Sequence, residues 1–408
     1  MSLVSEAVAK RPLDGLRVAD FSRVLAGPYC TRMLADLGAE IIKIEPPEGD
    51  VSRRLGPRRG GMSGYYMQQN CGKQNVSLDL KNPRGRDLAL QIIRRCDVLV
   101  ENFRPGVMAG LGLGPDEVRR GQPELVYCAI SGFGATGPAR DQRAFAGIAH
   151  ASTGTLWRQA TIMGQRTADS VLALGDTVTG LQATIAILAA LALRSRTGEG
   201  QFIDMAMHDA LLSVQEAANF YLFPEEPSET DFLCSWVYRA ADRDIVMPTD
   251  PRADWDTLCR VMGQPKLRDD PRYDTPQKRA ECLDELEAHI QSWVLEQPDA
   301  DSVVAALHAA GLPGARVSTL GEALESEQTL ARDMTPERPD RSGRHVRVLN
   351  SPYRFSDATA GVRGVPAFRG EHNATVLAGL LGLSATEISR LEIDGIISSR
   401  LPGGGDKR

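Results

Sequence analysis

The sequence predicts an α/β protein whose parallel sheet is covered by helices on both faces. From Leu13 to about Arg196, short β-branched runs alternate with helical patterns, which is typical of such a sheet. Prolines and acids then crowd residues 223–231 without periodicity, so we expect a domain boundary there. The segments beyond it have helical periodicity, which predicts a smaller helical or α+β unit.

The first element pattern is a strand, a helix and a second strand. "GLRVADF" predicts the first strand, and Met33, Leu34 and Leu37 share one face of the helix that follows. Gly38 stands where a C-cap glycine belongs, and "AEIIKIE" predicts the second strand, ending at Glu45. This is the outline of a dinucleotide-binding unit, in which Glu45 would hold a ribose, but the glycine-rich turn of such a unit is absent.

Later elements repeat this order. Pro83 begins a helix before the strand "DVLVENF", and "ELVYCAISGF" predicts another strand. The apolar stretch at residues 181–193 is shorter than the ~20 residues of a membrane span, so we expect a buried helix and no membrane segment. Near the end, Ser384 and Glu387 form a capping box that starts a further helix.

Composition excludes several classes of protein. The 47 basic and 53 acidic residues give a net charge of -6, so there is no global field to hold nucleic acid or an anionic membrane. The seven cysteines form no CxxC pair, and no signal peptide precedes the first strand. We therefore expect reduced thiols, no metal site and a cytoplasmic location.

The sharpest local signal for chemistry is Asp176. It immediately precedes a long apolar helix, so its carboxylate would face unpaired N–H groups and stay ionised as a nucleophile. The alternative is an aspartate that only caps the helix, and position alone favours this alternative.

Other loops follow predicted strands, where open α/β sheets bind ligands. Asn102, Phe103 and Arg104 offer an amide, an aromatic face and a cation, or else form an ordinary turn. The glycines of residues 131–138 and the cations near Lys81 leave the same choice open. For His150, as for His208, no partner is evident, so we expect core or surface roles.

Six stretches occur in the order seen in the family III coenzyme A transferases, and the chain resembles this family. They are "LDGLRVADFSRVLAGPYCTRMLADLGAEIIKIEPPEGD", "SLDLKNPRGRD", "DVLVENFRPG", "SGFGATGP", "LGDTVTG" and "RTGEGQFIDMAMHDALL". The resemblance implies a doubly wound, Rossmann-like large domain formed by both chain ends, a smaller α+β domain, and an interlocked, ring-like homodimer. We place the large domain at residues 1–222, the small domain at 223–325, and a linker with the return to the large domain at 326–408.

The resemblance also implies a site and a reaction. Asp176 matches the acyl-carrying nucleophile, which would pass through a mixed anhydride and an aspartyl-CoA thioester. Coenzyme A would move between an acyl-CoA and a carboxylic acid, and we expect a dicarboxylic acid. No permanently bound cofactor is implied, and Glu45 becomes a strand-end residue. The positions matching contacts to coenzyme A are Val24, Leu25, Ala26, Leu78, Lys81, Asn102, Phe103, Arg104, Ser131, Gly132 and Phe133.

Two rival functions stay open. An α-methylacyl-CoA racemase would place its aspartate at the same position, but Phe145 stands where the racemases have a catalytic histidine. A coenzyme A-binding protein without turnover is the other rival, and a nicotinamide dehydrogenase lacks its glycine fingerprint. No glycine-rich run between Glu225 and Arg243 matches the loop of the oxalate enzyme. Arg158, Arg166 and Tyr238 are candidate contacts to the acid.

Overall fold

The computed structural model describes residues 10–223 and 236–400. The chain separates into two compact units, and the larger combines the residues up to Gln215 with those from Leu330 onward. The smaller unit spans Glu216–Thr329. The large unit is therefore built from two separate stretches of chain, with its divisions at 215 and 330 in place of 222 and 326.

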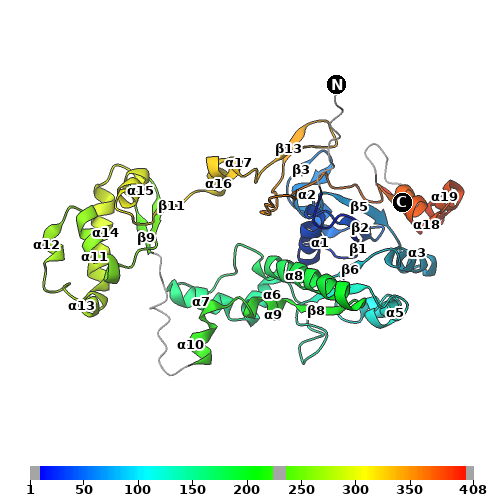
Figure 1. Cartoon of the computed structure of the whole chain (residues 1–408), viewed down its shortest axis with the longest axis horizontal. Helices are drawn as coiled ribbons and strands as arrows, with labels where there is room; N and C mark the ends of the chain where they lie inside the picture. The colour runs from blue at the N-terminus through cyan, green and yellow to red at the C-terminus, as the bar shows by residue number, and fades with distance from the viewer. Residues whose placement is uncertain (1–9, 224–235, 401–408) are drawn as a thin grey trace. The chain divides into compact units, whose positions relative to one another are not determined.

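The large unit contains a six-stranded sheet in which every pair of neighbours is parallel. Its order is β5-β2-β1-β6-β7-β8 (Figure 1). The strands are β1 (Arg17–Asp20), β2 (Glu40–Glu45), β5 (Lys73–Ser77), β6 (Val98–Glu101), β7 (Val126–Ser131) and β8 (Phe202–Ala206). Val18 of β1 is paired with both Ile41 and Val98. The strand order reverses between β1 and β6, and ligands of such sheets bind where that reversal leaves a crevice.

Helices cover both faces of this sheet. One face carries α1 (Ala26–Asp36), α6 (Ala146–Ser152), α8 (Leu174–Thr197) and α9 (Met207–Leu212), and its core includes Leu34 and Ile187. The other carries α3 (Pro83–Ile93), α5 (Pro115–Arg120), α18 (Asn373–Leu381) and α19 (Ala385–Ile393), with Leu88 and Leu377 fully buried. The doubly covered parallel sheet is thus present, and its second face depends on residues from the end of the chain (Figure 1).

Helix α8 differs from the buried helix that we expected at residues 181–193. It packs along α1 and buries a stripe that includes Ala183 and Ile187, but Leu181 and Ile185 on another face are exposed. Among the described residues, it is the one helix with the length and apolar composition to cross a membrane. The small and apolar residues that α8 packs against α1 identify α8 as a helix that covers the sheet.

The remaining elements of the large unit are short. They are η1 (Val51–Arg54), β3 (Arg58–Arg59), β4 (Met62–Ser63), α2 (Gly64–Asn70), α4 (Val107–Gly110), α7 (Thr155–Ile162), β12 (Glu337–Pro339) and β13 (His345–Arg347). Strands β3 and β4 form one antiparallel hairpin, and β12 and β13 form another.

The smaller unit combines helices with a three-stranded antiparallel sheet of order β11-β10-β9. Its strands are β9 (Trp236–Arg239), β10 (Asp244–Met247) and β11 (Ala315–Arg316). Its helices are η2 (Glu216–Ala218), α10 (Asn219–Leu222), α11 (Pro251–Val261), α12 (Pro265–Arg268), α13 (Pro276–Glu281), α14 (Leu283–Glu296), α15 (Ala300–Ala309) and α16 (Leu320–Glu325), and α17 (Glu327–Ala331) crosses the division. Trp255 and Ile290 lie in a core separate from the two cores of the sheet.

Candidate active site

A cavity of about 170 Å³ lies at the carboxyl ends of β1, β6 and β7. This is the edge of the sheet where the strand order reverses, so its position follows from the topology. Its walls come from the loops after these strands, from the first turn of α8 and from the start of α9. The lining residues are Arg23, Val24, Asn102, Phe103, Arg104, Pro105, Ile130, Ser131, Gly132, Gln142, Ala144, Phe145, Asp176 and Met207.

Among the described residues that line this cavity, Asp176 is the one carboxylate. Helix α8 begins at Leu174, so Asp176 lies inside its first turn and does not cap it, contrary to the simpler expectation. Its carboxylate accepts the backbone N–H of Ala26, the first residue of α1. Burial raises the pKa of Asp176 above the usual value for an aspartate, and the hydrogen bond from the Ala26 N–H opposes this rise. The carboxylate therefore faces the positive end of α1, a different helix from its own.

Close packing of two helices creates this arrangement. A Cβ atom added at Gly180 of α8 would lie 2.7 Å from the carbonyl oxygen of Ala26. Only glycine permits that approach, one helical turn after Asp176. A Cβ at Gly175 would similarly lie 3.0 Å from the Cα of Ala146 in α6. The glycines of "LGDTVTG" thus allow α8 to lie against α1 and α6 so that Asp176 reaches the cavity.

His150 supports the backbone beside Asp176. Its imidazole is 1% exposed, and its Nε2 atom accepts the N–H of Gly175 at 3.0 Å. Its Nδ1 atom lies 2.8 Å from the Asp169 carboxylate. These two contacts require a neutral ring with its proton on Nδ1. The expected core role of His150 is confirmed, and the partners that hold it lie 19 and 25 residues further along the chain.

The loop between β1 and α1 holds a strained residue at the cavity wall. Val24 has φ of 66°, which is rare for a β-branched side chain. Its N–H donates to the two carboxylate oxygens of Asp50 at 3.3 and 3.2 Å, and Asp50 pairs with Lys43 at 3.3 Å. The buried Asp50–Lys43 pair therefore fixes the unusual backbone of Val24.

Asn102 joins two of the loops that line the cavity. Its side-chain oxygen accepts the N–H of Arg23 at 2.7 Å, and its side-chain nitrogen donates to the Arg23 carbonyl at 2.8 Å. The Asn102 side-chain amide thus binds the protein backbone. The sequence had left open that this amide contacts a ligand. The Arg23 guanidinium lies 5.0 Å from the centre of the Phe103 ring, so an aromatic face and a cation do occur together beside the cavity.

The other positions that match coenzyme A contacts differ in how far they are buried. Leu25 and Ala26 are buried at the start of α1, and Phe133 packs against His208 with ring centres 5.7 Å apart. Leu78 is buried after β5 and exposed Lys81 follows it. Leu78 and Lys81 lie beyond β2 on the same edge of the sheet and do not line the cavity.

Other residues named from the sequence lie away from the cavity. Glu45 is buried and accepts hydrogen bonds from Arg53, Tyr66 and Asn75. Burial opposes its ionisation, but Arg53, Lys43 and Tyr66 lower the pKa of Glu45 to about 2, which fits a strand-end residue in an ion pair.

Of the candidate contacts to an acid substrate, the two arginines in the large unit do not line the cavity. Arg158 lines a different cavity along α7, and Tyr238 is buried in the smaller unit. Arg166 is exposed and is not among the lining residues. The stretch examined for a glycine-rich loop falls largely on residues 224–235, outside the described residues.

Sequence reasoning missed part of the lining. Arg23, Gln142 and Met207 line the cavity, but none of them was named as a site residue, although Arg23 and Met207 lie inside the stretches that carry the resemblance. Tyr65 also belongs near the nucleophile: burial raises the pKa of its phenol, and the negative charges of Asp176 and Asp50 raise it further. For Arg23, the available signal was its position directly before Val24, which the resemblance had named as a contact to coenzyme A.

The arrangement suits acyl transfer. One desolvated carboxylate faces a cavity that holds two arginines, Arg23 and Arg104, and the mainly apolar residues Ile130, Phe145 and Met207. Arginines bind phosphate and carboxylate groups, and the apolar walls limit access of water to a covalent intermediate. Among the described residues, no group of three His, Cys, Asp or Glu side chains could hold a metal ion.

Comparison with known proteins identifies the family of the chain. The sequence model of a family described as CoA-transferase family III matches residues 13–373. A succinyl-CoA:D-citramalate CoA-transferase from Chloroflexus aurantiacus is 32% identical over 398 residues, which cover 95% of this chain and 98% of the relative. A formyl-CoA:oxalate CoA-transferase from Streptomyces avermitilis is 33% identical, covering 95% and 100%.

A solved structure resembles the whole fold. The crystal structure of a CAIB/BAIF family protein from Brucella suis superposes with a TM-score of 0.80 at 30% identity. The match covers 91% of this chain and 100% of that protein.

Proposed function

The chain belongs to CoA-transferase family III, and we propose that it moves coenzyme A from an acyl-CoA to a carboxylic acid, with Asp176 as the covalent carrier. The observation that carries this proposal is the single desolvated carboxylate in a cavity formed by the loops that match coenzyme A contacts. Relatives use different acids, among them citramalate and oxalate. These acids are dicarboxylic, so we propose a dicarboxylic acid as acceptor.

The reaction proceeds by exchange at the Asp176 carboxyl group. A carboxylate oxygen attacks the thioester carbonyl of the donor, the C–S bond breaks, and a mixed anhydride and the CoA thiolate form. The thiolate then attacks the aspartyl carbonyl, which releases the donor acid and leaves an aspartyl-CoA thioester. The acceptor carboxylate attacks that thioester, and the returning thiolate cleaves the new anhydride at the acceptor carbonyl. Every step exchanges one acyl bond for another, so no ATP is needed.

The N–H of Ala26 is the donor placed to stabilise the oxyanions on the aspartyl carbon. It already contacts the carboxylate, and it carries the positive end of α1, where charge develops in each tetrahedral intermediate. The N–H of Gly175 is the other nearby candidate, but His150 accepts it. The oxyanion donor therefore comes from α1, although the nucleophile is on α8.

The racemase alternative requires a second acid or base on the opposite side of the substrate. Phe145 occupies the position of the racemase histidine and lines the cavity. His150 lies beside Asp176 through its contact with Gly175, but both of its ring nitrogens are engaged by Gly175 and Asp169. The geometry therefore favours transfer over racemisation.

We also propose a homodimer. Several large apolar side chains of the large unit are exposed, including Ile185 of α8 and Phe145, Trp157 and Leu172. A monomer that leaves such residues in water gains by covering them with a second copy. Light scattering coupled to gel filtration tests this proposal, and a mass equal to one chain would contradict it.

The reaction is tested with a panel of acyl-CoA donors and carboxylic acids, each exchange followed by mass spectrometry. We expect transfer to at least one acid, together with a mass increase on the peptide that contains Asp176 when the enzyme is quenched during turnover. Bound coenzyme A without exchange in any pair would favour a binding protein. Exchange of the α-proton of a branched acyl-CoA would favour the racemase.

A further inference from the structure

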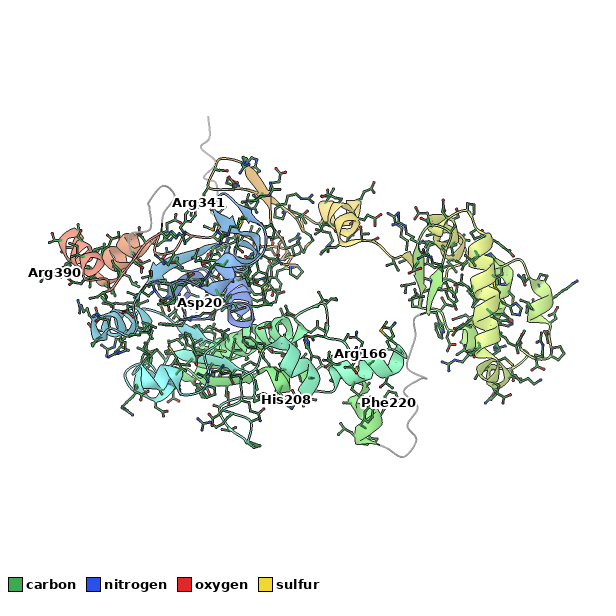
Figure 2. The ribbon with its side chains drawn as sticks, turned by 180° about the vertical axis from the view of Figure 1, so that it is seen from behind. Asp20, Arg166, His208, Phe220, Arg341 and Arg390 are labelled. Atoms are coloured by element: carbon green, nitrogen blue, oxygen red, sulfur yellow. The ribbon has the colours of Figure 1, made fainter. Side chains whose placement is uncertain are left out.

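A second and larger cavity, of about 650 Å³, lies elsewhere on the large unit. It is enclosed by η1, the β3–β4 hairpin, the turn after β12 and the segment that leads to α18. Arg341 marks this region, next to the hairpin of β12 and β13 (Figure 2). The cavity shares no lining residue with the cavity of Asp176. Six of its lining residues are arginines, namely Arg53, Arg54, Arg58, Arg341, Arg369 and Arg400.

Positive charge exceeds negative charge at this cavity, although the whole chain has a net charge of -6. Within the described part of the chain, two lining residues, Glu48 and Asp50, are acidic. Asp50 is already engaged by Lys43 and by backbone N–H groups, so its charge is neutralised locally. Exposed Arg54 and Arg58 form no ion pair within the described part of the chain.

Contacts within the protein hold two of the arginines that line the cavity in place. Arg53 donates to both oxygens of Glu45 at 2.8 and 2.9 Å, and its guanidinium lies 3.8 Å from the centre of the Tyr66 ring. Arg341, also a lining residue, pairs with Glu371 at 2.7 Å and lies 5.7 Å from the centre of the Phe368 ring. Two arginines are therefore fixed in place, and Arg54 and Arg58 extend from the same segment as Arg53 toward the same space.

We propose that this cavity binds a small molecule with at least two anionic groups, either phosphates or carboxylates. Guanidinium groups bind both kinds of anion through paired hydrogen bonds, and the volume lies within the range of small-molecule sites. A bound multivalent anion also relieves the repulsion among clustered arginines. This inference does not depend on the transferase reaction, because it uses none of the residues at the Asp176 cavity.

The test is a calorimetric titration with inorganic pyrophosphate, with citrate as a second arm that separates phosphate from carboxylate ligands. The protein is first saturated with coenzyme A, so that the cavity of Asp176 is not available to the probe. The test variant replaces both free arginines, Arg54→Ala with Arg58→Ala. The matched control is Arg59→Ala, because Arg59 is the exposed neighbour of Arg58 and does not line the cavity.

We expect saturable binding of at least one probe to the wild type, weakened by about tenfold or more in the double variant and unchanged in the control. Circular dichroism checks that both variants keep the wild-type fold, as exposed positions should. Absence of saturable binding of either probe to the wild type would overturn the proposal. So would equal binding by the wild type and the double variant, or an equal loss in the control.

Discussion

Asp20 and Asp176 lie at the same edge of the sheet, but their surroundings are opposite. Asp20 ends β1 beside α1 (Figure 2) and is fully buried, where it accepts hydrogen bonds from Ser22 and Thr31 and pairs with Lys73 at 3.1 Å. Asp176 faces a cavity with one backbone donor. Burial acts against ionisation of both, but the lysines lower the pKa of Asp20 below its usual value, and that of Asp176 is raised.

The comparison shows which aspartate stabilises the fold and which is available for reaction. A carboxylate whose oxygens are all engaged holds a loop in place, and its loss leaves a buried cation without a partner. A carboxylate with one donor keeps lone pairs for an incoming carbonyl. Asp20, beneath the loop of Arg23 and Val24, therefore supports the cavity in which Asp176 reacts.

The largest effect is expected from Asp176→Asn. The amide keeps the shape and a contact to Ala26 but is not a nucleophile, so turnover should fall by roughly 10⁴-fold or more. Coenzyme A binding and the free energy of unfolding should stay close to those of the wild type. Exchange assays, calorimetry and denaturant titration measure the three quantities. Retained exchange would remove Asp176 from the mechanism.

Asp20→Asn should give the reverse pattern. It leaves the ammonium of Lys73 buried beside a neutral amide, so we expect the free energy of unfolding to fall by about 3–5 kcal/mol. Denaturant titration measures the loss, and Asp87→Asn is the control because Asp87 forms an exposed pair with Arg84, which is worth little. A loss no larger than that of the control would show that the buried network does not stabilise the loop.

His150→Ala should lower kcat by about tenfold to a hundredfold, because it removes the acceptor of the Gly175 N–H and loosens the turn that aims Asp176. His150→Gln should recover much of this loss, since its side-chain oxygen can accept the same N–H. His208→Ala is the matched control, as His208 contacts Phe133 and Ser152 instead. Equal losses in the alanine and glutamine variants would point to a role other than positioning.

The pH dependence tests the difference between Asp20 and Asp176 without changing any residue. Activity requires ionised Asp176, so kcat/KM should fall as the pH drops through a pKa above that of an ordinary aspartate. The lowered pKa of Asp20 means that its contribution to stability is present above its unfolded-state pKa and is lost only as the pH falls further. Activity should therefore decrease while the near-UV circular dichroism spectrum is unchanged. Simultaneous loss of both would contradict the assignment.

The sequence predicted the sheet because parallel strands and their covering helices leave strong periodic signals, as in "AEIIKIE". It also predicted the loops of the cavity, since motifs at strand ends meet on one edge of a parallel sheet. The start of α8 was misplaced because Leu174 and Gly175 form a helical turn without a capping side chain. His150 with Asp169, and the six arginines of the second cavity, were not predictable because their partners come together only through tertiary packing.

The return of the chain to the large unit has a consequence for biosynthesis. Leu377 and Ile397 complete the core on one face of the sheet, and Leu78 forms a β-bridge with Ile397. A ribosome therefore releases all six strands long before the segment that seals this face has been translated. Until then a nascent chain exposes apolar sheet surface, and we expect chaperones that hold such surfaces to engage it during synthesis.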